Sequence, residues 1–337
     1  MTSRIIATGS YLPDNIVTNE FLSTLVDTSD EWISSRTGIK TRTISSGEGT
    51  TQMATAAAFK ALKNANISAE ELDYIIVATI SADRCMPSTA CEVQSNIGAT
   101  NAACFDLASA CSGFVYGLQV ANSLLQTTNT LRALVIGAET LSKLIDWEDR
   151  STCVLFGDGA GAAIIEKNEN GIIDTILGSD GDKGYALTCD IRAIKNPFIQ
   201  IEGAYISEDQ SNSNSSCNSL SDEFIRMDGQ EVYKFAVTKV TETIQAILKR
   251  NQLLQDEIDY FILHQANERI IQAVAKRLKV DLSRFPMNLQ QYGNTSAATI
   301  PILLDELNRT KHLEPGDKII LSGFGGGLTW GTMLLTW

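Results

Sequence analysis

The chain has 337 residues, of which 44 % are hydrophobic, and it contains 24 glycines; this suits one large or two fused α/β domains with a substantial core. Its formal net charge of -13 argues against a nucleic-acid-binding protein, so an acidic partner would need a local basic patch. No apolar run is long enough to span a bilayer, and no signal-peptide pattern precedes the first strand.

The cysteines and histidines point to a reducing compartment and away from a metal site. The seven cysteines form no CxxC pair, and two histidines do not complete a zinc-like cluster. Scattered thiols without a secretory signal indicate a cytoplasmic protein.

The first predicted elements are a strand over residues 4–8 and a short helix with Ser29 or Asp30 as its N-cap. Trp32 and Arg36 lie four residues apart on one face of this helix. An aromatic ring beside a guanidinium group suits an adenine ring and a phosphate. A surface tryptophan packed on an arginine stem is the more common alternative.

The next predicted elements alternate between helices and strands, as in an α/β domain. In order, they are an Ala-rich helix at 50–66, a buried strand at 72–79, a loop at 84–89, a helix from about residue 90, an apolar helix after Cys111, a strand at 131–137 and a glycine-rich turn at 156–161 that leads into a strand.

Cys111 follows a run of small residues and begins a segment that is apolar on almost every side, which predicts a buried helix. A thiol in the first turn of such a helix lies at the positive end of the helix dipole, which favours the nucleophilic thiolate. The alternative is a packed core cysteine, because free cysteine is among the most buried residue types.

The second half of the chain repeats the order of the first. The predicted strand at 258–263 resembles residues 72–77, at a numbering offset of 258 − 72 = 186. Residues 319–321 resemble 134–136, at an offset of 319 − 134 = 185, and a glycine-rich turn again leads into a strand. Matches in the same order at a nearly constant offset imply a duplicated fold with pseudo-twofold symmetry.

We therefore divide the chain into an N-terminal half at 1–170, a connecting region at 171–228 and a C-terminal half at 229–337. The connecting region contains a polar, low-complexity run at 211–219 that has nothing to bury. We expect residues 203–222 to form a mobile surface loop, with a lid or a partner-contact segment as the functional alternative.

Two further polar residues lie at the ends of predicted elements in the second half. His264 ends the strand over 258–263, where α/β sheets present side chains to a ligand crevice. A satisfied structural histidine is the alternative, but polar residues follow it, and the other histidine, His312, lies in a turn-like stretch. Asn294 opens a helix at an offset of 294 − 111 = 183 from Cys111, a point that we interpret as equivalent in the repeat.

These motifs resemble those of the β-ketoacyl-acyl-carrier-protein synthases III of the thiolase superfamily, and the resemblance runs nearly end to end. The matching stretches are Asp30–Trp32 with Arg36–Ile39, Ala110–Gly113, Phe156–Gly161, His264–Asn267, Gly293–Ala297, and Gly323–Gly327 with Thr329–Gly331. The resemblance implies a thiolase-like five-layered αβαβα fold made of two duplicated α/β halves. It also implies a homodimer without a metal or a redox cofactor.

The resemblance implies the initiating condensing enzyme of type II fatty-acid synthesis. Such an enzyme joins acetyl-coenzyme A, or another short acyl-coenzyme A, to malonyl-acyl carrier protein and releases CO₂ and coenzyme A. Cys111 would hold the acyl group covalently, with the backbone N–H groups of Cys111 and Gly326 as the oxyanion hole. His264 and Asn294 would donate hydrogen bonds to the malonyl thioester carbonyl, which requires a neutral His264 with its Nε2–H toward the substrate.

The resemblance also assigns substrate-binding residues. Trp32 and Arg150 would sandwich the adenine of coenzyme A. Arg36 would hold the phosphate end, and Asn267 would complete the coenzyme A site. Met86 would close the acyl pocket of the partner subunit, where a flexible thioether would admit acetyl or slightly longer primers.

Acyl carrier proteins are acidic, and a cluster of basic residues offers them a docking surface. Arg269 and Lys276 are seven residues apart and share a helical face, with Arg277 and Lys279 close by. An ordinary solvated helix face is the alternative for each of these charges.

Three other functions compete with the initiating synthase. A related condensing enzyme of secondary metabolism would keep the chemistry and use a different acyl primer or acceptor. A Cys-His-Asn hydrolase would use the same residue types, but papain-like proteases carry other local sequences and no duplicated α/β halves. A non-catalytic partner of a true synthase would not need Cys111, His264 and Asn294 together.

Overall fold

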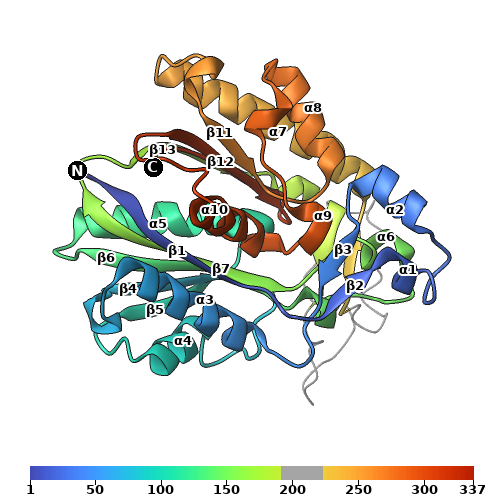
Figure 1. The fold of residues 1–337 in the computed structure, drawn as a ribbon, viewed down its shortest axis with the longest axis horizontal. Helices are drawn as coiled ribbons and strands as arrows, with labels where there is room; N and C mark the ends of the chain where they lie inside the picture. The colour runs from blue at the N-terminus through green and yellow to red at the C-terminus, as the bar shows by residue number, and fades with distance from the viewer. Residues whose placement is uncertain (191–222) are drawn as a thin grey trace, which may run out of the picture.

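Two β-sheets with helices between and outside them make up the chain, of which the computed structural model describes residues 1–190 and 223–337 (Figure 1). The first sheet has five strands, in the spatial order β1 (Thr2–Tyr11), β7 (Gly159–Asn168), β6 (Arg132–Glu139), β4 (Tyr74–Ala78) and β5 (Ala103–Leu107). The second sheet has four, in the order β11 (Tyr260–Leu263), β12 (Lys318–Gly325), β13 (Thr329–Thr336) and β8 (Ile172–Ser179). Two short ribbons pair β2 (Ile16–Thr18) with β3 (Thr41–Thr43), and β9 (Leu187–Cys189) with β10 (Ile225–Met227).

The long helices complete five layers, which confirms the predicted αβαβα fold (Figure 1). The central layer holds α5 (Gly113–Thr127) and α10 (Thr299–Arg309), and each contacts strands of both sheets. The helices α3 (Thr50–Ala65) and α4 (Thr89–Ile97) cover the first sheet, and α7 (Gly229–Arg250) and α8 (Glu268–Leu278) cover the second. The short helices are α1 (Asn19–Leu22), α2 (Asp30–Thr37), α6 (Arg150–Cys153) and α9 (Leu289–Tyr292). The 3₁₀ turns are η1 (Ala69–Glu71), η2 (Ala110–Ser112), η3 (Leu141–Leu144), η4 (Gly181–Ala186), η5 (Gln255–Glu257), η6 (Leu282–Arg284) and η7 (Ser296–Ala298).

Helix α5 is held by its apolar surface rather than by its cap. No side chain caps its first turn, but Phe114, Val115 and Leu118 are fully buried between the sheets. Burial of each such side chain stabilises the fold by about 1.5–3 kcal/mol, which outweighs a missing cap of about 1 kcal/mol. Gly117 lets the helix approach β6, because a Cβ there would lie 2.9 Å from a methyl group of Val135.

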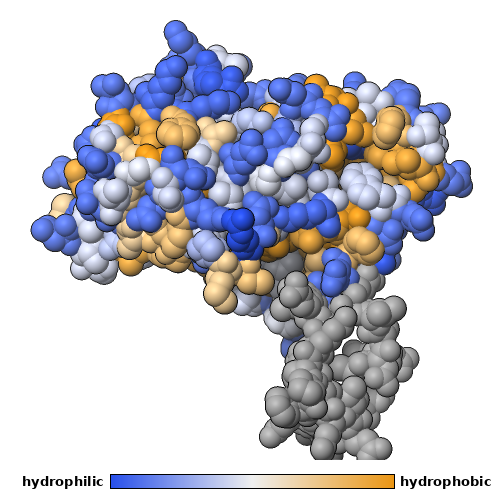
Figure 2. Space-filling model, turned by 90° about the horizontal axis from the view of Figure 1, so that it is seen from below, coloured by the Kyte–Doolittle hydropathy of each residue, from blue (hydrophilic) through white to orange (hydrophobic). Residues whose placement is uncertain are grey.

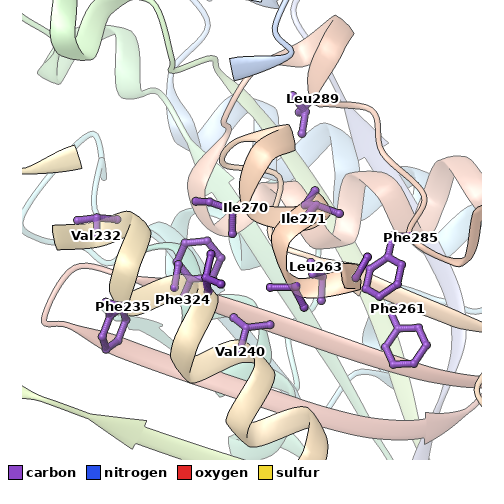
Figure 3. Packing of buried hydrophobic residues seen from close by; sticks show 14 of the residues in the cluster. Val232, Phe235, Val240, Phe261, Leu263, Ile270, Ile271, Phe285, Leu289 and Phe324 are labelled. Atoms are coloured by element: carbon purple, nitrogen blue, oxygen red, sulfur yellow. The ribbon is translucent and has the colours of Figure 1, made fainter. Parts of the chain in front are cut away.

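The core above the second sheet fixes the strand that carries His264. Phe235 and Val240 of α7 pack toward the sheet, and Leu263 and Phe324 belong to the same buried cluster (Figure 3). Phe261 stacks on Phe285 at a ring-centre distance of 4.8 Å. The last residues of β11 therefore have little freedom to move.

The duplication is visible in strand register. Tyr74 of β4 pairs with Ala133 of β6, and Tyr260 of β11 pairs with Ile319 of β12. Both partners are shifted by the same offset in residue number, 260 − 74 = 319 − 133 = 186. The predicted alignment of Leu134 with Ile319 is therefore wrong by one residue, because the register sets the offset at 186 throughout this strand pair.

The second half departs from the repeat in one place, since its sheet has no counterpart of β5 among the described residues. Strand β8, which lies inside the predicted connecting region of 171–228, pairs antiparallel with β13 as β1 pairs with β7. It therefore takes the place in the second sheet that β1 has in the first. The polar run at 211–219, predicted to lie in a mobile loop, is outside the described residues.

The outer surface over α3 and α4 mixes hydrophilic side chains with separate apolar patches (Figure 2). Within residues 1–190 and 223–337, none of the helices is both long and apolar enough to cross a membrane.

Candidate active site

The structure brings Cys111, His264 and Asn294 to one cavity of about 210 Å³. Each comes from a different element, and each is almost completely buried. The cavity opens past residues of α2, α7 and α8. Its other lining residues are Trp32, Arg36, Thr37, Ser151, Val154, Leu155, Phe156, Leu187, Met227, Gly229, Val232, Tyr233, Ala266, Asn267, Ile270, Phe324 and Gly325.

Cys111 lies in the 3₁₀ turn η2, immediately before α5. The preceding residue, Ala110, has a φ of 43°, a left-handed conformation that turns the chain sharply into the helix. The turn packs tightly on β12, because a Cβ on Gly325 would lie 2.6 Å from the Cys111 nitrogen. Glycine is therefore required at position 325 for Cys111 to reach its place.

The Cys111 thiol is protonated in this site. Burial raises the pKa of Cys111 to about 12, and the nearby Glu139 carboxyl adds to this rise while Ser296 opposes it. The helix end is expected to favour the thiolate, but in this site burial has the larger effect on the pKa of Cys111. Acylation of Cys111 requires a group that accepts its proton.

His264 follows β11 and is neutral. Burial lowers the pKa of His264 to about 3, and the edge of the Phe324 ring contacts the imidazole at a centre distance of 5.0 Å. Its Nδ1 lies 2.7 Å from the Thr299 hydroxyl, which leaves Nε2 for the cavity. Thr299 also lies 2.9 Å from the Ser296 carbonyl. For Nε2 to carry the hydrogen, the Thr299 hydroxyl must donate to Nδ1 rather than to that carbonyl.

Asn294 is fixed through its backbone and its side-chain oxygen. Its N–H donates to the Leu155 carbonyl at 2.9 Å, and its carbonyl accepts from the Gly157 N–H at 3.0 Å. Its Oδ1 accepts from the Ser296 N–H at 2.9 Å, so the Nδ2 amide is the group available to the cavity. The side chain is therefore oriented as a hydrogen-bond donor.

Asn294 is not the repeat counterpart of Cys111. The first residues of η2 and η7, Ala110 and Ser296, are both left-handed, with φ of 43° and 51°, and their numbers differ by 296 − 110 = 186. At this offset the counterpart of Cys111 is Ala297. The predicted equivalence is wrong because the strand register sets the offset at 186 rather than 183.

A second cavity of about 490 Å³ lies on the other side of Cys111. Cys111, Phe156 and Leu187 line both cavities, and Gly326 lines this one. The cavity is largely apolar, which suits an acyl chain. Its remaining lining residues are Ile80, Ala108, Ser109, Ala110, Leu141, Leu144, Thr188, Cys189, Asp190, Ile225, Ser296, Gly327 and Thr329.

Comparison with known proteins gives the same assignment as the motifs. A family model described as 3-oxoacyl-[acyl-carrier-protein] synthase III matches residues 105–181, and the model of its C-terminal part matches residues 248–337. A β-ketoacyl-[acyl-carrier-protein] synthase III of Clostridium botulinum is 53% identical over 334 residues, 99% of this chain and 98% of the relative. The chain belongs to the β-ketoacyl-acyl-carrier-protein synthase III family. It is thus an acyltransferase of the condensing-enzyme type.

Solved structures agree with this assignment. The 3-oxoacyl-[acyl-carrier-protein] synthase III of Aquifex aeolicus is 43% identical, with a TM-score of 0.89, and the match covers 99% of this chain and 100% of that one. The priming β-ketosynthase of the R1128 polyketide pathway is 32% identical, with a TM-score of 0.87, over 99% of this chain and 96% of that one. The family resemblance found in the motifs is therefore confirmed, and with it the thiolase-like fold.

The arginines assigned to coenzyme A in this family member both stack on Trp32. The Arg36 and Arg150 guanidinium carbons lie 4.7 Å and 4.8 Å from the centre of the Trp32 ring. Arg150 also donates to the Asp27 carbonyl at 2.8 Å, and it does not line the cavity that holds Cys111. At 4.8 Å there is no room for an adenine between the Arg150 and Trp32 side chains, so an adenine sandwich requires Arg150 to move.

The other predicted binding residues lie in different environments. Asn267 lines the cavity, caps α8 through a 2.8 Å bond from the Arg269 N–H, and donates to the Arg36 carbonyl at 3.2 Å. Met86 is 82% exposed and lines neither cavity of its own chain.

The basic residues predicted to dock a carrier protein lie on and after α8. Arg269, Lys276, Arg277 and Lys279 are exposed. Arg269 donates to the Ser35 carbonyl at 2.7 Å, which ties this basic face to α2 beside the cavity entrance.

Three polar residues of the site were missed in the sequence. Ser296 and Thr299 follow Asn294 closely in the sequence, and this proximity to a candidate hydrogen-bond donor could have indicated that they belong to the site. Glu139 ends an ordinary buried strand, and nothing in its local sequence indicates that it reaches the centre of the molecule.

Proposed function

We propose that this chain catalyses the decarboxylative condensation of acetyl-coenzyme A, or another short acyl-coenzyme A, with malonyl-acyl carrier protein. The products are 3-oxoacyl-acyl carrier protein, CO₂ and coenzyme A. The observation that supports this proposal is the position of Cys111, which lies between a cavity lined by His264 and Asn294 and a second, apolar cavity. The roles of the residues follow from this arrangement.

In the first half-reaction, Cys111 attacks the acyl thioester and coenzyme A leaves. The thioester enters past Trp32, Arg36 and Asn267 along the first cavity. The backbone N–H groups of Cys111 and Gly326 stabilise the negative charge that develops on the thioester oxygen. The acyl chain extends into the second cavity, which is the larger of the two, at about 490 Å³ against about 210 Å³.

In the second half-reaction, malonyl-acyl carrier protein occupies the emptied first cavity. His264 Nε2–H and Asn294 Nδ2–H donate to its thioester carbonyl and stabilise the enolate formed when CO₂ leaves. A neutral imidazole can fill this role when its hydrogen is on Nε2, because that nitrogen then donates toward the cavity. The enolate carbon then attacks the acyl-Cys111 carbonyl, and the cysteine is released.

Binding of the carrier protein uses the exposed basic residues around α8. Arg269, Lys276 and Arg277 form a local cationic face on a protein whose formal net charge is -13. An acidic carrier protein would be steered to this face and away from the rest of the surface.

A homodimer gives exposed Met86 a role. In a symmetric dimer, this side chain would close the acyl cavity of the partner subunit and limit primer length. We propose a cytoplasmic enzyme that uses acyl-coenzyme A and malonyl-acyl carrier protein as substrates and needs no cofactor.

A second candidate is a condensing enzyme of secondary metabolism. It is favoured by the similarity to a polyketide priming synthase and by an acyl cavity of about 490 Å³, which an acetyl group does not fill. Cys111→Ser would abolish acylation in either case. The two candidates therefore have to be distinguished by which acyl-coenzyme A primer acylates Cys111.

Mass spectrometry of the Cys111 peptide after incubation with a panel of acyl-coenzyme A thioesters tests the proposal. An acyl adduct on Cys111 is expected, and a preference for acetyl-coenzyme A supports fatty-acid initiation. Selective acylation by a bulkier primer supports the second candidate. Absence of any adduct with every primer would overturn both.

A further inference from the structure

We propose that Glu139 accepts the proton of the Cys111 thiol during acylation, through the hydroxyl group of Ser296. This inference rests on the proposed role of Cys111 as the acylated nucleophile. It supplies the acceptor that a protonated, buried thiol requires.

The three groups lie next to one another. The Ser296 hydroxyl donates to Glu139 Oε1 at 3.1 Å, and the turns that carry Ser296 and Cys111, η7 and η2, pack against each other. Ser296 and Cys111 both line the acyl cavity, whereas Glu139 lies behind them and has no exposed surface. In the proposed relay the thiol donates its proton to Ser296, and Ser296 donates its own to the carboxylate.

The surroundings of Glu139 stabilise a carboxylate without a neighbouring cation. Its oxygens accept hydrogen bonds from the Thr79 hydroxyl at 3.2 Å, from the Ile80 N–H at 3.2 Å and from the Ser81 hydroxyl, all on the segment after β4. Within the described residues it forms no salt bridge, and the titratable group that faces it is Cys111 on η2.

Burial and these hydrogen bonds have opposite effects on the pKa of the Glu139 carboxyl group, and together they bring it close to physiological pH. Burial raises the pKa of Glu139 to about 7, and the hydrogen bonds from Ser81, Ile80, Ser296 and Thr79 limit the rise. Both its charged and its neutral forms are therefore populated at physiological pH. This is the property that a general base needs.

The duplicated half shows that the fold does not require this polar chain. At the offset of 186 set by the strand register, the counterpart of Glu139 is Gly325 and that of Ser296 is Ala110. These two residues make the equivalent contact, since a Cβ on Gly325 would lie 3.2 Å from the Ala110 Cβ. One half thus makes this contact with apolar groups, and the other makes it with a carboxyl and a hydroxyl next to the nucleophile.

The proposed step conserves atoms and charge. As the Cys111 sulfur bonds to the thioester carbon, its proton moves to Ser296 Oγ, and the Ser296 hydroxyl proton moves to Glu139. The C=O electron pair shifts to the oxygen in the oxyanion hole. When the adduct collapses, the C–S bond to coenzyme A breaks, and coenzyme A leaves along the first cavity as a thiolate that takes a proton from water. Glu139 keeps its proton until the second half-reaction releases the Cys111 thiolate, which regains it through Ser296.

Single-turnover acylation by acetyl-coenzyme A, followed by mass spectrometry between pH 6 and 9, tests the proposal. For the wild type we expect the rate to rise with pH and level off above an inflection near 7, because the carboxylate is the active form. Glu139→Gln should remove this inflection and slow acylation at least ten-fold at pH 8. Ser296→Ala should do the same while retaining the backbone N–H that holds Asn294.

Ser296→Ala is expected to fold, because Ala110 adopts the same left-handed conformation at the equivalent point. Ser81→Ala is the matched control, since it removes a hydroxyl from the same carboxyl group but lines neither cavity. It should keep acylation and move the inflection to higher pH, because the carboxylate loses a donor.

A second assay separates this role from a structural one. Malonyl decarboxylation by the Cys111→Ala variant needs only His264 and Asn294, so adding Glu139→Gln or Ser296→Ala should leave its rate unchanged. Acylation of both single variants at the wild-type rate with the wild-type inflection would overturn the relay and leave Cys111 as the nucleophile. Failure of the wild type to acylate at Cys111 would instead overturn the proposed function.

Discussion

The two halves of the molecule share a backbone plan and differ in what they place at its centre. In each half a left-handed residue opens a 3₁₀ turn that leads into a central helix, at Ala110 and at Ser296. The first turn carries Cys111, whereas the second carries Ala297 at the same point. The duplicated fold therefore supplies two equivalent positions, and only one of them carries a thiol.

At the strand ends, by contrast, the second half carries the polar residues and the first half carries small apolar ones. His264 follows β11 and bonds to Thr299, and the corresponding residues of the first half are Ala78 and Gly113, because 264 − 78 = 299 − 113 = 186. This pair is also in contact, because a Cβ on Gly113 would lie 2.9 Å from the Ala78 Cβ. The same contact is thus a packing contact in one half and a histidine–hydroxyl bond in the other. The groups proposed to be catalytic therefore occupy repeat positions whose counterparts only pack.

The largest effect expected is at the position where the halves differ most. Cys111→Ala leaves both turns with alanine, and condensation should fall by at least about 10³-fold, because the covalent route is lost. Stopped-flow or radiolabel assays of 3-oxoacyl-acyl carrier protein formation measure this. Cys85→Ser, a change at an exposed thiol, should leave the rate unaltered. Near-normal turnover without Cys111 would refute its assignment.

His264→Ala makes the second strand end resemble the first. Decarboxylation of the malonyl thioester should fall by about 10²–10³-fold, the effect typical of removing one preorganised donor to a developing oxyanion. Self-acylation by acyl-coenzyme A should be retained, since Cys111 and its oxyanion hole are untouched. Release of CO₂ and the Cys111 adduct are measured separately. If acylation alone were lost, the roles of the two residues would be reversed.

Thr299→Val removes the hydroxyl bound to His264 Nδ1 and keeps a branched side chain. Condensation should fall about ten-fold, because the Nε2–H form of the imidazole is no longer selected, and Thr299→Ser should restore most of the rate. ¹⁵N NMR of the imidazole reports the tautomer directly. An unchanged tautomer in Thr299→Val would show that another group orients His264.

The smallest effect is expected outside the duplicated centre, where Arg150 stacks on Trp32. Arg150→Ala should raise the KM for acyl-coenzyme A several-fold and leave kcat unchanged, since the bound adenine would lose a cation–π contact with the displaced guanidinium group, which contributes about 0.5–1 kcal/mol at an exposed site. Steady-state kinetics with acetyl-coenzyme A measures both constants. A change confined to kcat would place Arg150 in the chemistry instead of in binding.

Much of the fold was accessible from the sequence because its signals are local. The apolar helix after Cys111, the Ala-rich helix α3 and the resemblance of β11 to β4 depend on residues close together in the chain. The motif order identified the family, and similarity at 53% identity confirmed it. The exact pairing of repeat positions depended on strand register, which corrected the counterpart of Cys111 from Asn294 to Ala297.

The duplicated α/β plan, the family, and the candidates Cys111, His264 and Asn294 thus all follow from the order of residues along the chain. The protonation of these groups follows from packing instead. Burial keeps the Cys111 thiol protonated and His264 neutral, and it brings Glu139 near its titration point. Each effect depends on neighbours far away in the chain, as when Ser296 of the second half joins Cys111 and Glu139 of the first. A pKa responds to solvent exclusion and to the groups within hydrogen-bonding distance, and both are set by the folded arrangement rather than by local sequence.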